Sequence, residues 1–516
     1  MTEYTHLEKI RLQKIEELRA EGINPYPTRA ERTHTSAQAI TSLQMAEDST
    51  SEGSPAQEIR ATLAGRIRAT RPMGKLVFTH IEDGDGKIQL FMRVNELGQE
   101  KVDFFNKYYD IGDFIQAMGV MMRTRTGEAT LLVHDFKMLA KAVSPLPAAK
   151  DETMEDGTVI RHAALEDPEI RARQRYADLA VNAHIRENFR KRAAIIKALR
   201  AFLDDNGFLE VETPILQPLY GGAAARPFIT HHNELEQDMY LRISFELYLK
   251  RLLVGNLERV YEIGRDFRNE GVSFKHNPEF TQLEFYCAYA DYLKVMELTE
   301  NMIGYVCDTV FGTRKFTFEK EPGKAYDLDF STPWRRLEMR QGILETSGID
   351  INNHPTAESL FKAIVTKHPH KTPDPHVTRG KLIDFLLGEF LEPTLIQPTF
   401  LYNYPRDISP LAKPLPGDPL TVERFEGYAA GFELCNAFTE LNDPLDQEQR
   451  FLDMQEDYTD DEEEKNPLDE DYLRAMRYGM PPNGGFGMGV DRLTMLLTNN
   501  RSIREVLLFP ALRKEE

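Results

Sequence analysis

The sequence predicts an α+β protein with a small five-stranded barrel near its N-terminus and a larger domain of helices and strands behind it. Five short β-type runs separated by turn residues fill residues 61–143. From about residue 182, long helical patterns alternate with β-rich runs. With 516 residues, the chain also exceeds the usual size of one hydrophobic core, which favours several domains.

The composition is that of a folded chain with a polar surface: 41% of the residues are apolar, 28% are charged and the mean hydropathy is -0.46. The first residues lack the apolar stretch of a secretory signal, and no run has the roughly 18 apolar residues of a membrane span. Three cysteines without a C-x-x-C pair favour a reducing compartment. We therefore expect a cytoplasmic protein without a membrane segment.

Residues 1–60 are predicted to form a helical extension. Leu7, Ile10, Ile15 and Leu18 recur at roughly helical spacing with Lys and Glu between them. This pattern predicts an exposed amphipathic helix, followed by short helix and loose connection.

Five β-type runs predict the barrel, and they span residues 62–70, 75–83, 87–94, 113–124 and 129–139. Asp83–Gly86 and Arg125–Gly127 are tight-turn signals between runs. A five-stranded barrel of this size fits the OB-fold, which binds oligonucleotides, although other small barrels share the pattern.

The net charge of -20 is unfavourable for binding nucleic acid, since phosphate contacts depend on Lys and Arg. Between residues 61 and 143, however, 12 Lys and Arg face 10 Asp and Glu. Any RNA contact is therefore expected in the barrel. Behind it we predict a linker over residues 144–181 and a second domain over 182–516, with an insertion around 312–382.

The chain has neither a P-loop nor a Rossmann glycine motif, but three other constellations follow one another. The first is a helix ending at Asn206–Gly207, followed by a strand, FLEVETPIL, that contains Pro214. The second combines FRNEG (267–271), HNPEF (276–280) and QLEFY (282–286). The third is GGFGMGVDRL (484–493), whose glycines permit close approach of a ligand to the backbone.

These constellations, in this order, resemble the signature of class II aminoacyl-tRNA synthetases. The runs RQRYADL (173–179), GGAAARPF (221–228), FELYLK (245–250) and ELND (440–443) are similar to the lysyl-tRNA synthetase versions. The resemblance extends from about residue 58 to 510. It implies an antiparallel sheet flanked by helices as catalytic domain, and a homodimer interface that includes the segment near Pro214.

The resemblance also implies a reaction. Lysine and ATP form lysyl-adenylate, and the lysine is then transferred to the 3′ end of tRNA(Lys), with release of AMP and pyrophosphate. Positioning and charge stabilisation dominate such an in-line attack. Arg268 would bridge the lysine carboxylate and the α-phosphate, and Arg492 would hold the far phosphates. The implied ATP-binding residues are Arg268, Glu270, His276, Asn277, Phe280, Glu433 and Arg492, and the implied Mg²⁺ ligands are Glu426 and Glu433.

Recognition of lysine requires an acidic pocket, because a buried ε-ammonium needs a carboxylate partner. By resemblance, Glu440 and Tyr286 meet this ammonium, with Glu284 in support. Glu246 and Gly222 would bind the α-amino group. The implied lysine-binding residues are Gly222, Glu246, Arg268, Glu284, Tyr286, Asn436 and Glu440.

In the barrel, the resemblance assigns Phe78, Gln89 and Glu128 to the tRNA anticodon, where aromatic stacking on unpaired bases is common. Phe78 fits a core position equally well. Arg66, Arg71 and Lys75 fit either phosphate contacts or a solvated basic face. Cys435 is interpreted as a packing residue, and the acidic run 456–464 as an exposed loop.

Three alternatives stay open at this point. The chain fits a sister enzyme that charges aspartate or asparagine, although the acidic pocket argues against aspartate. It also fits a lysyl-transferring protein modifier, although such relatives lack the barrel. The third alternative is a regulatory RNA-binding protein with a decayed catalytic domain. Such decay would remove residues like Arg268 or Arg492, and both are present.

Overall fold

The computed structural model describes residues 3–49, 57–147, 150–153, 159–162, 165–457 and 467–514. The chain forms two compact units, Met1–Glu166 and Asp167–Glu516. In the described part of the chain, no helix is long and apolar enough to cross a membrane. Most of the predicted acidic loop at 456–464 lies outside the described residues.

The first unit contains a closed barrel with strand order β1-β2-β3-β5-β4, which confirms the predicted OB-fold. Its strands are β1 (Arg60–Met73), β2 (Leu76–Glu82), β3 (Lys87–Arg93), β4 (Phe114–Arg123) and β5 (Ala129–Ala140). Side chains along β2 point alternately into and out of the barrel. Val77, Thr79 and Ile81 are buried in its interior, whereas Phe78 and His80 between them stay partly exposed. Asp83 closes the β2–β3 turn by accepting hydrogen bonds from the next backbone amides.

Helices cover parts of this barrel. α1 (His6–Ala20) is amphipathic as predicted, but it is not exposed all round, because Leu18 joins the barrel core and Arg11 donates hydrogen bonds to the carbonyls of Ile111 and Ala142. α2 (Ser36–Asp48) buries Ala39 and Leu43 in the same core. The sequence analysis missed α3 (Val94–Leu97) and α4 (Gln99–Tyr108) between β3 and β4.

The predicted linker, residues 144–181, ends earlier in the structure. A short hairpin of β6 (Lys150–Thr153) and β7 (Val159–His162) follows the barrel. The next helices, α5 (Pro168–Arg173) and α6 (Arg175–Val181), belong to the second unit. The reason is Arg175, which is buried, pairs with Asp178 at 2.6 Å and donates to carbonyls near the C-terminal end of the described chain.

The second unit is built on a nine-stranded sheet with the order β16-β17-β19-β20-β21-β13-β12-β8, and β18 pairs with β19. The central pairs are antiparallel as predicted, whereas β16–β17 and β12–β8 at the edges are parallel. The strands are β8 (Leu209–Glu210), β12 (Arg259–Phe267), β13 (Glu279–Ala288), β16 (Arg335–Glu338), β17 (Thr399–Pro405), β18 (Pro414–Leu415), β19 (Asp418–Ala429), β20 (Phe432–Thr439) and β21 (Asn483–Gly489).

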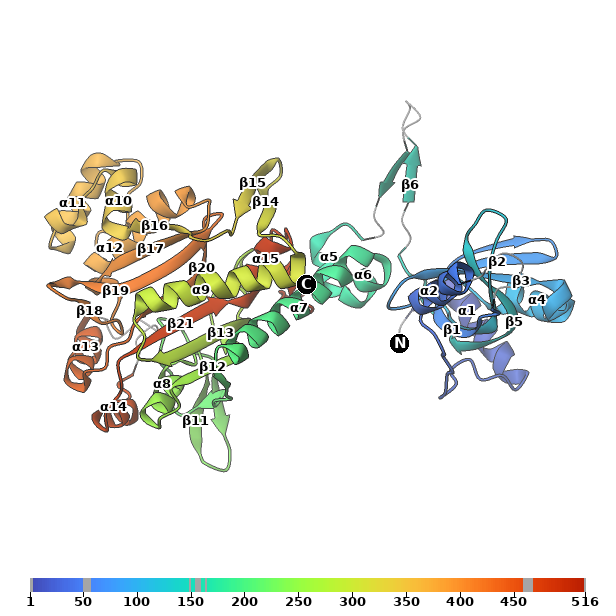
Figure 1. Ribbon diagram of the computed structural model, residues 1–516, viewed down its shortest axis with the longest axis horizontal. Coiled ribbons are helices and arrows are strands. Elements are labelled where there is room, and N and C mark those ends of the chain that lie inside the picture. Colours follow the sequence, from blue (N-terminus) through green and yellow to red (C-terminus); the bar gives the residue numbers. More distant parts are fainter. Residues whose placement is uncertain are drawn as a thin grey trace. The chain divides into compact units, whose positions relative to one another are not determined.

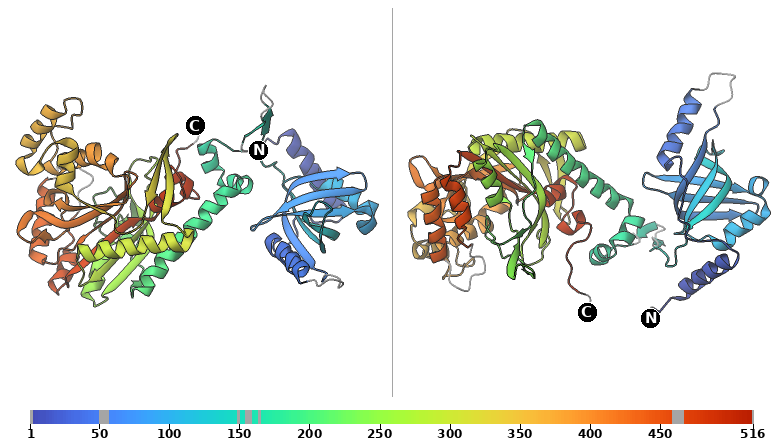
Figure 2. Two further views of the ribbon diagram at one scale, coloured as in Figure 1. Left: turned by 45° about the horizontal axis from the view of Figure 1, so that its top comes forward. Right: turned by 90° about the horizontal axis from the view of Figure 1, so that it is seen from below.

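Two long helices, α7 (Ala183–Asp205) and α9 (Tyr292–Val306), lie side by side against this sheet (Figures 1 and 2). Alternation on β13 explains the packing: Leu283, Phe285 and Cys287 enter the core shared with these helices. Phe285 stacks on Phe486 of β21, with ring centroids 4.6 Å apart. The intervening Glu284 therefore belongs to the opposite face of the sheet.

The predicted strand from Phe208 to Leu216 is broken in the structure. α7 ends at Asn206 with Gly207 at φ +78°, as its sequence predicts. Only β8 and β9 (Leu216–Gln217) remain of the strand, on either side of Pro214, which has no amide hydrogen to donate. β9 joins a separate three-stranded sheet with β10 (Ile229–His232) and β11 (Gln237–Leu241).

The insertion around 312–382 is an integral part of the second unit. It begins with a hairpin, β14 (Lys315–Glu321) and β15 (Lys324–Asp329), and continues with α10 (Met339–Ser347), α11 (Ala357–Lys367) and α12 (Arg379–Leu386). These three helices share one apolar core with Leu401 of β17 and Val422 of β19. The remaining α-helices are α8 (Glu246–Val254), α13 (Pro444–Asp457), α14 (Glu470–Arg477), α15 (Val490–Leu497) and α16 (Ile503–Val506).

Candidate active site

A cavity of about 350 Å³ lies on the face of the sheet opposite α7 and α9, lined by β13, β20, β21, the start of α8 and the loop after β12. The structure brings every predicted ATP and lysine residue to this lining: Gly222, Glu246, Arg268, Glu270, His276, Asn277, Phe280, Glu284, Tyr286, Glu433, Asn436, Glu440 and Arg492. Residues from five separate stretches of the chain, at 222, 246, 268–286, 433–440 and 492, therefore share one cavity.

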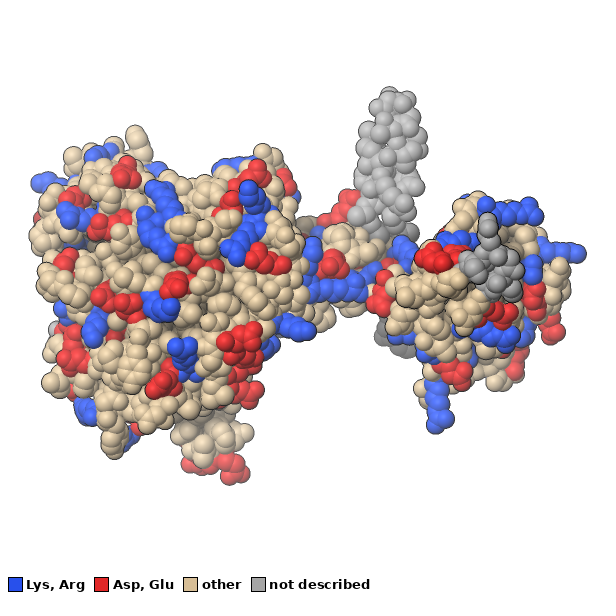
Figure 3. Space-filling model, viewed as in Figure 1, with Lys and Arg blue, Asp and Glu red and all other residues tan. Residues whose placement is uncertain are grey.

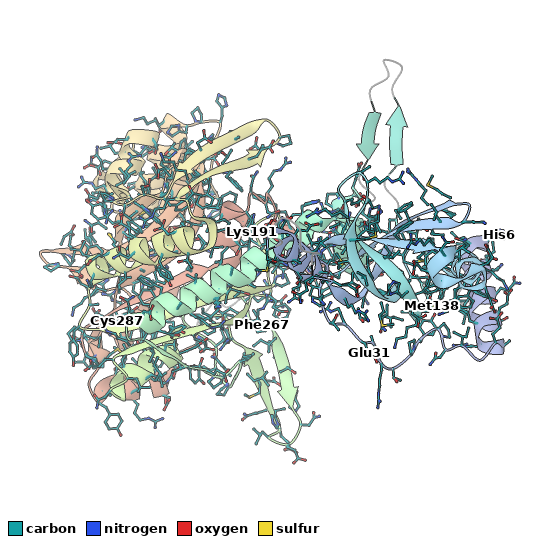
Figure 4. The ribbon with its side chains drawn as sticks, turned by 45° about the vertical axis from the view of Figure 1, so that its right-hand side comes forward. His6, Glu31, Met138, Lys191, Phe267 and Cys287 are labelled. Carbon is teal, nitrogen blue, oxygen red and sulfur yellow. The ribbon has the colours of Figure 1, made fainter. Side chains whose placement is uncertain are left out.

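The first cationic group is Arg268, in the loop between the antiparallel strands β12 and β13. Phe267 ends β12, whereas Cys287 lies toward the other end of the strand pair (Figure 4). The Arg268 guanidinium lies 5.2 Å from the centre of the Phe280 ring. Among the described residues, the buried Nε of Arg268 has no acceptor, so this nitrogen is available to an anionic ligand.

The second cationic group is Arg492, at the start of α15. It donates to the carbonyl of Glu433 at 3.0 Å and to its carboxylate at 3.1 Å. Burial would raise the pKa of Glu433, but the charge and hydrogen bond of Arg492 lower it below its usual value. Desolvation and then Arg492 lower the pKa of His276 to about 4, so His276 is neutral at pH 7 and adds no cation.

Other residues near the two arginines stabilise the loop between β12 and β13. His276 is hydrogen-bonded to Ser273 at 2.9 Å. Asn277 donates to the carbonyl of Glu279 and accepts from the amide of Ala511, so its side chain braces the chain around the cavity. Glu270 is exposed and lines the cavity mouth.

The opposite end of the cavity is acidic. The Glu284 carboxylate accepts hydrogen bonds from Ser244 at 2.9 Å, Gln282 at 2.9 Å and Tyr286 at 3.1 Å. Burial, together with Asp266 and Glu246, raises the pKa of Glu284 to about 8. Burial and Glu284 likewise raise the pKa of Tyr286 well above its usual value, so its hydroxyl stays protonated.

Glu440, which follows β20, is buried at this acidic end. Its Oε1 receives no hydrogen bond from the part of the chain that the structure describes. Its Oε2 forms an ion pair with Lys250 of α8, which also pairs with Glu246 at 2.5 Å. Burial raises the pKa of Glu440 well above its usual value, and Lys250 opposes this shift.

Two glycines allow these carboxylates to approach the backbone. A Cβ on Gly485 would lie 1.9 Å from Oε1 of Glu440 and 2.5 Å from the ring of Tyr286. Gly222, at φ +87°, would place a Cβ 3.0 Å from that of Glu246. A larger residue at either position would displace an acidic side chain.

The predicted metal ligand Glu426 does not line the cavity. Its carboxylate accepts hydrogen bonds from Tyr404 at 2.8 Å, Tyr428 at 2.5 Å and Arg424 at 2.5 Å. Burial, and to a smaller extent the charge of nearby Glu433, raises the pKa of Glu426. Within the described residues, no cluster of three or more His, Cys, Asp or Glu forms a metal site from protein groups alone. A Mg²⁺ ion usually takes one or two carboxylates plus phosphate oxygens, so Glu433, which lines the cavity, fits such a shared site. Glu426 would first have to leave its tyrosine and arginine partners.

On the barrel, the predicted anticodon residues Phe78 and Gln89 lie on the neighbouring strands β2 and β3, and Glu128 lies directly before β5. Phe78 is half-buried and stacks on Phe91, with ring centroids 4.6 Å apart. Gln89 donates to Glu128 at 2.9 Å, and His80 is hydrogen-bonded to the same carboxylate at 2.9 Å. These side chains form one aromatic and polar surface, which we call the barrel face.

The basic residues of the barrel differ in their surroundings. Arg71 and Lys75 are exposed. Arg66 instead lies 4.3 Å from the centre of the Phe114 ring, donates to the carbonyl of Gly112, and has a pKa lowered by burial. In the second unit, acidic and basic side chains are interspersed over the face that Figure 3 shows.

Sequence reasoning missed Ser244 and Gln282 of the cavity lining and Lys250, which pairs with two of the lining acids from behind them. Lys250 is four residues after Glu246 on one helix, and this i, i+4 spacing was a readable signal for their pair. Ser244 and Gln282, which orient Glu284, carry no comparable signal. Cys435, by contrast, is buried as expected for a packing residue, and burial raises the pKa of its thiol.

Comparison with known proteins agrees with this geometry. Residues 167–513 match the family described as tRNA synthetases class II (D, K and N), and residues 61–139 match the OB-fold nucleic acid binding domain. An antiparallel sheet that carries two arginines and an acidic pocket in one cavity defines a class II aminoacyl-tRNA synthetase. The chain belongs to the class II tRNA synthetases (D, K and N).

Three close relatives belong to one group within this family, the lysine–tRNA ligases. The chain is 48% identical over 513 residues to the lysine–tRNA ligase of Chloroflexus aurantiacus, covering 99% of each chain. It is 48% identical over 515 residues to the lysine–tRNA ligase of Dehalococcoides mccartyi, covering 100% of this chain and 98% of the relative. The lysine–tRNA ligase of Clostridium novyi is 46% identical, with 99% and 95% covered. All three relatives carry the same name.

Proposed function

We propose that this protein is a lysine–tRNA ligase. It activates lysine with ATP to lysyl-adenylate and then transfers the lysine to the 3′ end of tRNA(Lys), releasing AMP and pyrophosphate. The observation that carries the proposal is the cavity itself, in which two arginines stand at one end and the acids Glu246, Glu284 and Glu440 at the other.

The arginine end suits the phosphates of ATP. Arg268 contacts the lysine carboxylate and the α-phosphate together, which holds the attacking oxygen in line with the phosphorus. Arg492 takes the far phosphates, and Phe280 offers its ring to the adenine. No side chain has to remove a proton, because the lysine carboxylate is already ionised.

The acidic end suits a diammonium amino acid. Glu440 and Tyr286 meet the ε-ammonium, with Glu284 in support, and Glu246 and Gly222 meet the α-amino group. Asn436, which lines the cavity while accepting a hydrogen bond from Arg424, lies at the lysine carboxylate. An enzyme that binds aspartate would need cationic groups at this end of the cavity, because the aspartate side chain is negatively charged.

Mg²⁺ is the proposed metal, with Glu433 and Glu426 as its protein ligands. The ion supplies charge neutralisation on the phosphates when bound. Arg492, which already orients the Glu433 carboxylate, keeps this ligand ionised at neutral pH.

We further propose a cytoplasmic homodimer. The aliphatic side chains of Leu209, Ile215 and Leu216, close to Pro214 in the sequence, are exposed, and exposed apolar side chains are common at protein interfaces. Sedimentation of the purified protein checks this assignment, and a monomer at micromolar concentration contradicts it.

Amino-acid-dependent exchange between ATP and pyrophosphate, assayed with each amino acid in turn, tests the proposed function. Lysine is expected to support exchange, and total tRNA is expected to accept lysine. Activation of aspartate or asparagine in preference to lysine would identify a sister enzyme instead. No exchange with any amino acid would support a regulatory protein.

Glu440→Gln is expected to raise the KM for lysine by roughly 100-fold, because an uncharged amide replaces the carboxylate that meets the ammonium. The KM for ATP is expected to stay within about threefold, since Glu440 lies at the other end of the cavity. Steady-state exchange kinetics measure both constants. Unchanged use of lysine would refute the pocket assignment.

Phe78→Ala is expected to weaken tRNA(Lys) binding by roughly tenfold, through loss of aromatic stacking on an anticodon base. Exchange without tRNA is expected to be unaffected. Charging kinetics at varied tRNA concentration measure the effect, with Met73→Ala, an exposed apolar residue of the same barrel, as control. An unchanged KM for tRNA would show that Phe78 only packs against Phe91.

A further inference from the structure

Lys250 is an ionised side chain that the proposed reaction does not use. It is fully buried in α8, yet its ammonium joins two carboxylates from distant parts of the sequence, Glu246 at 2.5 Å and Glu440. The ring centres of Phe438 and Tyr286 lie 5.5 Å and 5.9 Å from the same nitrogen. Two acids and two aromatic rings therefore hold this ammonium.

The charges at this end of the cavity explain why a cation is needed. Glu246, Glu284 and Glu440 are all buried within it. Three ionised carboxylates without a partner repel one another and bind protons instead. With Lys250 in place, full ionisation leaves two negative charges, which equals the number of ammonium groups on lysine.

The geometry also separates the functions of the two Glu440 oxygens. Neither Glu440 oxygen has a hydrogen-bond partner among the described residues, but Oε2 forms the ion pair with Lys250. Oε1 is also the atom that a Cβ on Gly485 would meet. One oxygen is thus tied to the helix, and the other remains for a ligand.

We propose that Lys250 is a positioning residue for recognition of the diammonium substrate. Its ammonium fixes the carboxylates of Glu246 and Glu440 in the cavity and keeps them ionised, so that each can bind one ammonium group of lysine. This inference rests on the proposed function, because it takes lysine as the amino acid.

Removal of Lys250 changes how lysine binding depends on pH. The groups that face Glu440 are Lys250 and Glu246 of α8, Glu284 and Tyr286 of β13, and Tyr472 of α14. Lys250 is the cation of this set and lowers the pKa of Glu440. Without it the pKa of Glu440 rises further, so the carboxylate becomes protonated at a higher pH and loses its ammonium partner there.

The test compares the wild-type protein with Lys250→Met in lysine-dependent pyrophosphate exchange. The KM for lysine is expected to rise by roughly 30-fold or more at pH 7, with the KM for ATP within about threefold. The rise of this KM toward low pH is expected to begin at a higher pH than in the wild type. Equal KM values and equal pH profiles for lysine would overturn the proposal.

A matched control comes from the barrel. Lys141 is also fully buried and pairs with two carboxylates, Asp110 at 2.5 Å and Asp113 at 2.6 Å. Lys141→Met is expected to lower thermal stability without changing the KM for lysine. If both variants raise this KM alike, the effect of Lys250 reflects general destabilisation, and the proposal fails.

A double variant separates charge from packing. In a Glu440→Gln background, Lys250→Met is expected to raise the KM for lysine by a smaller factor than in the wild-type background, since one of the two carboxylates that Lys250 fixes is already neutral. An effect as large as in the wild-type background would overturn the proposal. Lys250→Arg keeps the cation, and its KM for lysine is expected to be closer to wild type than that of Lys250→Met.

The wild-type protein provides a measurement that needs no variant to fold. Calorimetric titration with lysine at pH 7, in two buffers of different ionisation enthalpy, counts the protons released on binding. Release of at most about two protons is expected, from Glu284 and Asp266, whose pKa values burial raises to about 8 and about 7. Release of three or more would show that Glu440 is also protonated beforehand and would overturn the proposal. Absence of lysine binding to the wild type would instead refute the proposed function.

Discussion

Arg268→Gln is expected to lower kcat for lysine-dependent pyrophosphate exchange by roughly 1,000-fold. Its guanidinium is the charged group that contacts both reacting molecules in the proposed reaction, and removal of one preorganised donor at a developing charge typically costs a factor of about 100 to 1,000. The orphaned Nε and the nearby Phe280 ring indicate that this side chain is held ready for an anion. Single-turnover formation of adenylate measures the loss.

The control for this prediction is Arg265→Gln. Arg265 belongs to β12, the strand just before the Arg268 loop, but its side chain is 41% exposed and pairs with Glu279 at 3.6 Å, a surface contact of little energetic weight. Exchange by this variant is expected to match the wild type. Less than a tenfold loss in Arg268→Gln, with the fold intact, would remove Arg268 from the reaction.

Gly485→Ala is expected to raise the KM for lysine by roughly 100-fold while the protein still binds ATP. Its Cβ would lie 1.9 Å from Oε1 of Glu440 and 2.5 Å from the Tyr286 ring, so one of these side chains must leave its position. Overpacking of this kind costs about 1 to 3 kcal/mol, and the displaced groups are those that meet the ε-ammonium. Exchange kinetics at varied lysine and ATP separate the two effects.

Gly388→Ala serves as the matched control, because a Cβ at Gly388 meets nothing within 4 Å and its φ is not positive. It is expected to leave both KM values unchanged. If Gly485→Ala also leaves the KM for lysine unchanged, the ammonium does not bind beside Glu440.

The barrel and the catalytic sheet were predictable because their signals are local. Alternation around Val77 and Ile81, and the turn at Asp83, depend on neighbouring residues alone. Leu283 and Phe285 likewise alternate with Gln282 and Glu284 in the sequence, and both enter the core on one face of β13. Helices α3 and α4 were missed because their segment lies between two strong strand signals and has only a short apolar pattern of its own.

Pro214 shows how a correct motif can still mislead about structure. FLEVETPIL has the composition of one strand, but a residue without an amide hydrogen cannot continue a ladder of hydrogen bonds. The helices at Pro168–Val181 were wrongly assigned to a linker, because the contacts that fix them are made with residues far away in the sequence. Their anchor is Arg175, whose carbonyl partners belong to Arg504 and Leu508, far away in the sequence.

The sequence motifs, through their resemblance to a known family, were enough to identify the family and to name the two arginines and the acids that line the cavity. Folding alone revealed that Lys250 joins Glu246 to Glu440, that Glu426 is turned toward two tyrosines, and that Gly485 makes room for a carboxylate. These contacts link residues on different strands and helices. Periodicity and local propensity describe neighbours along the chain, so they carry no information about which distant side chains will share one buried space.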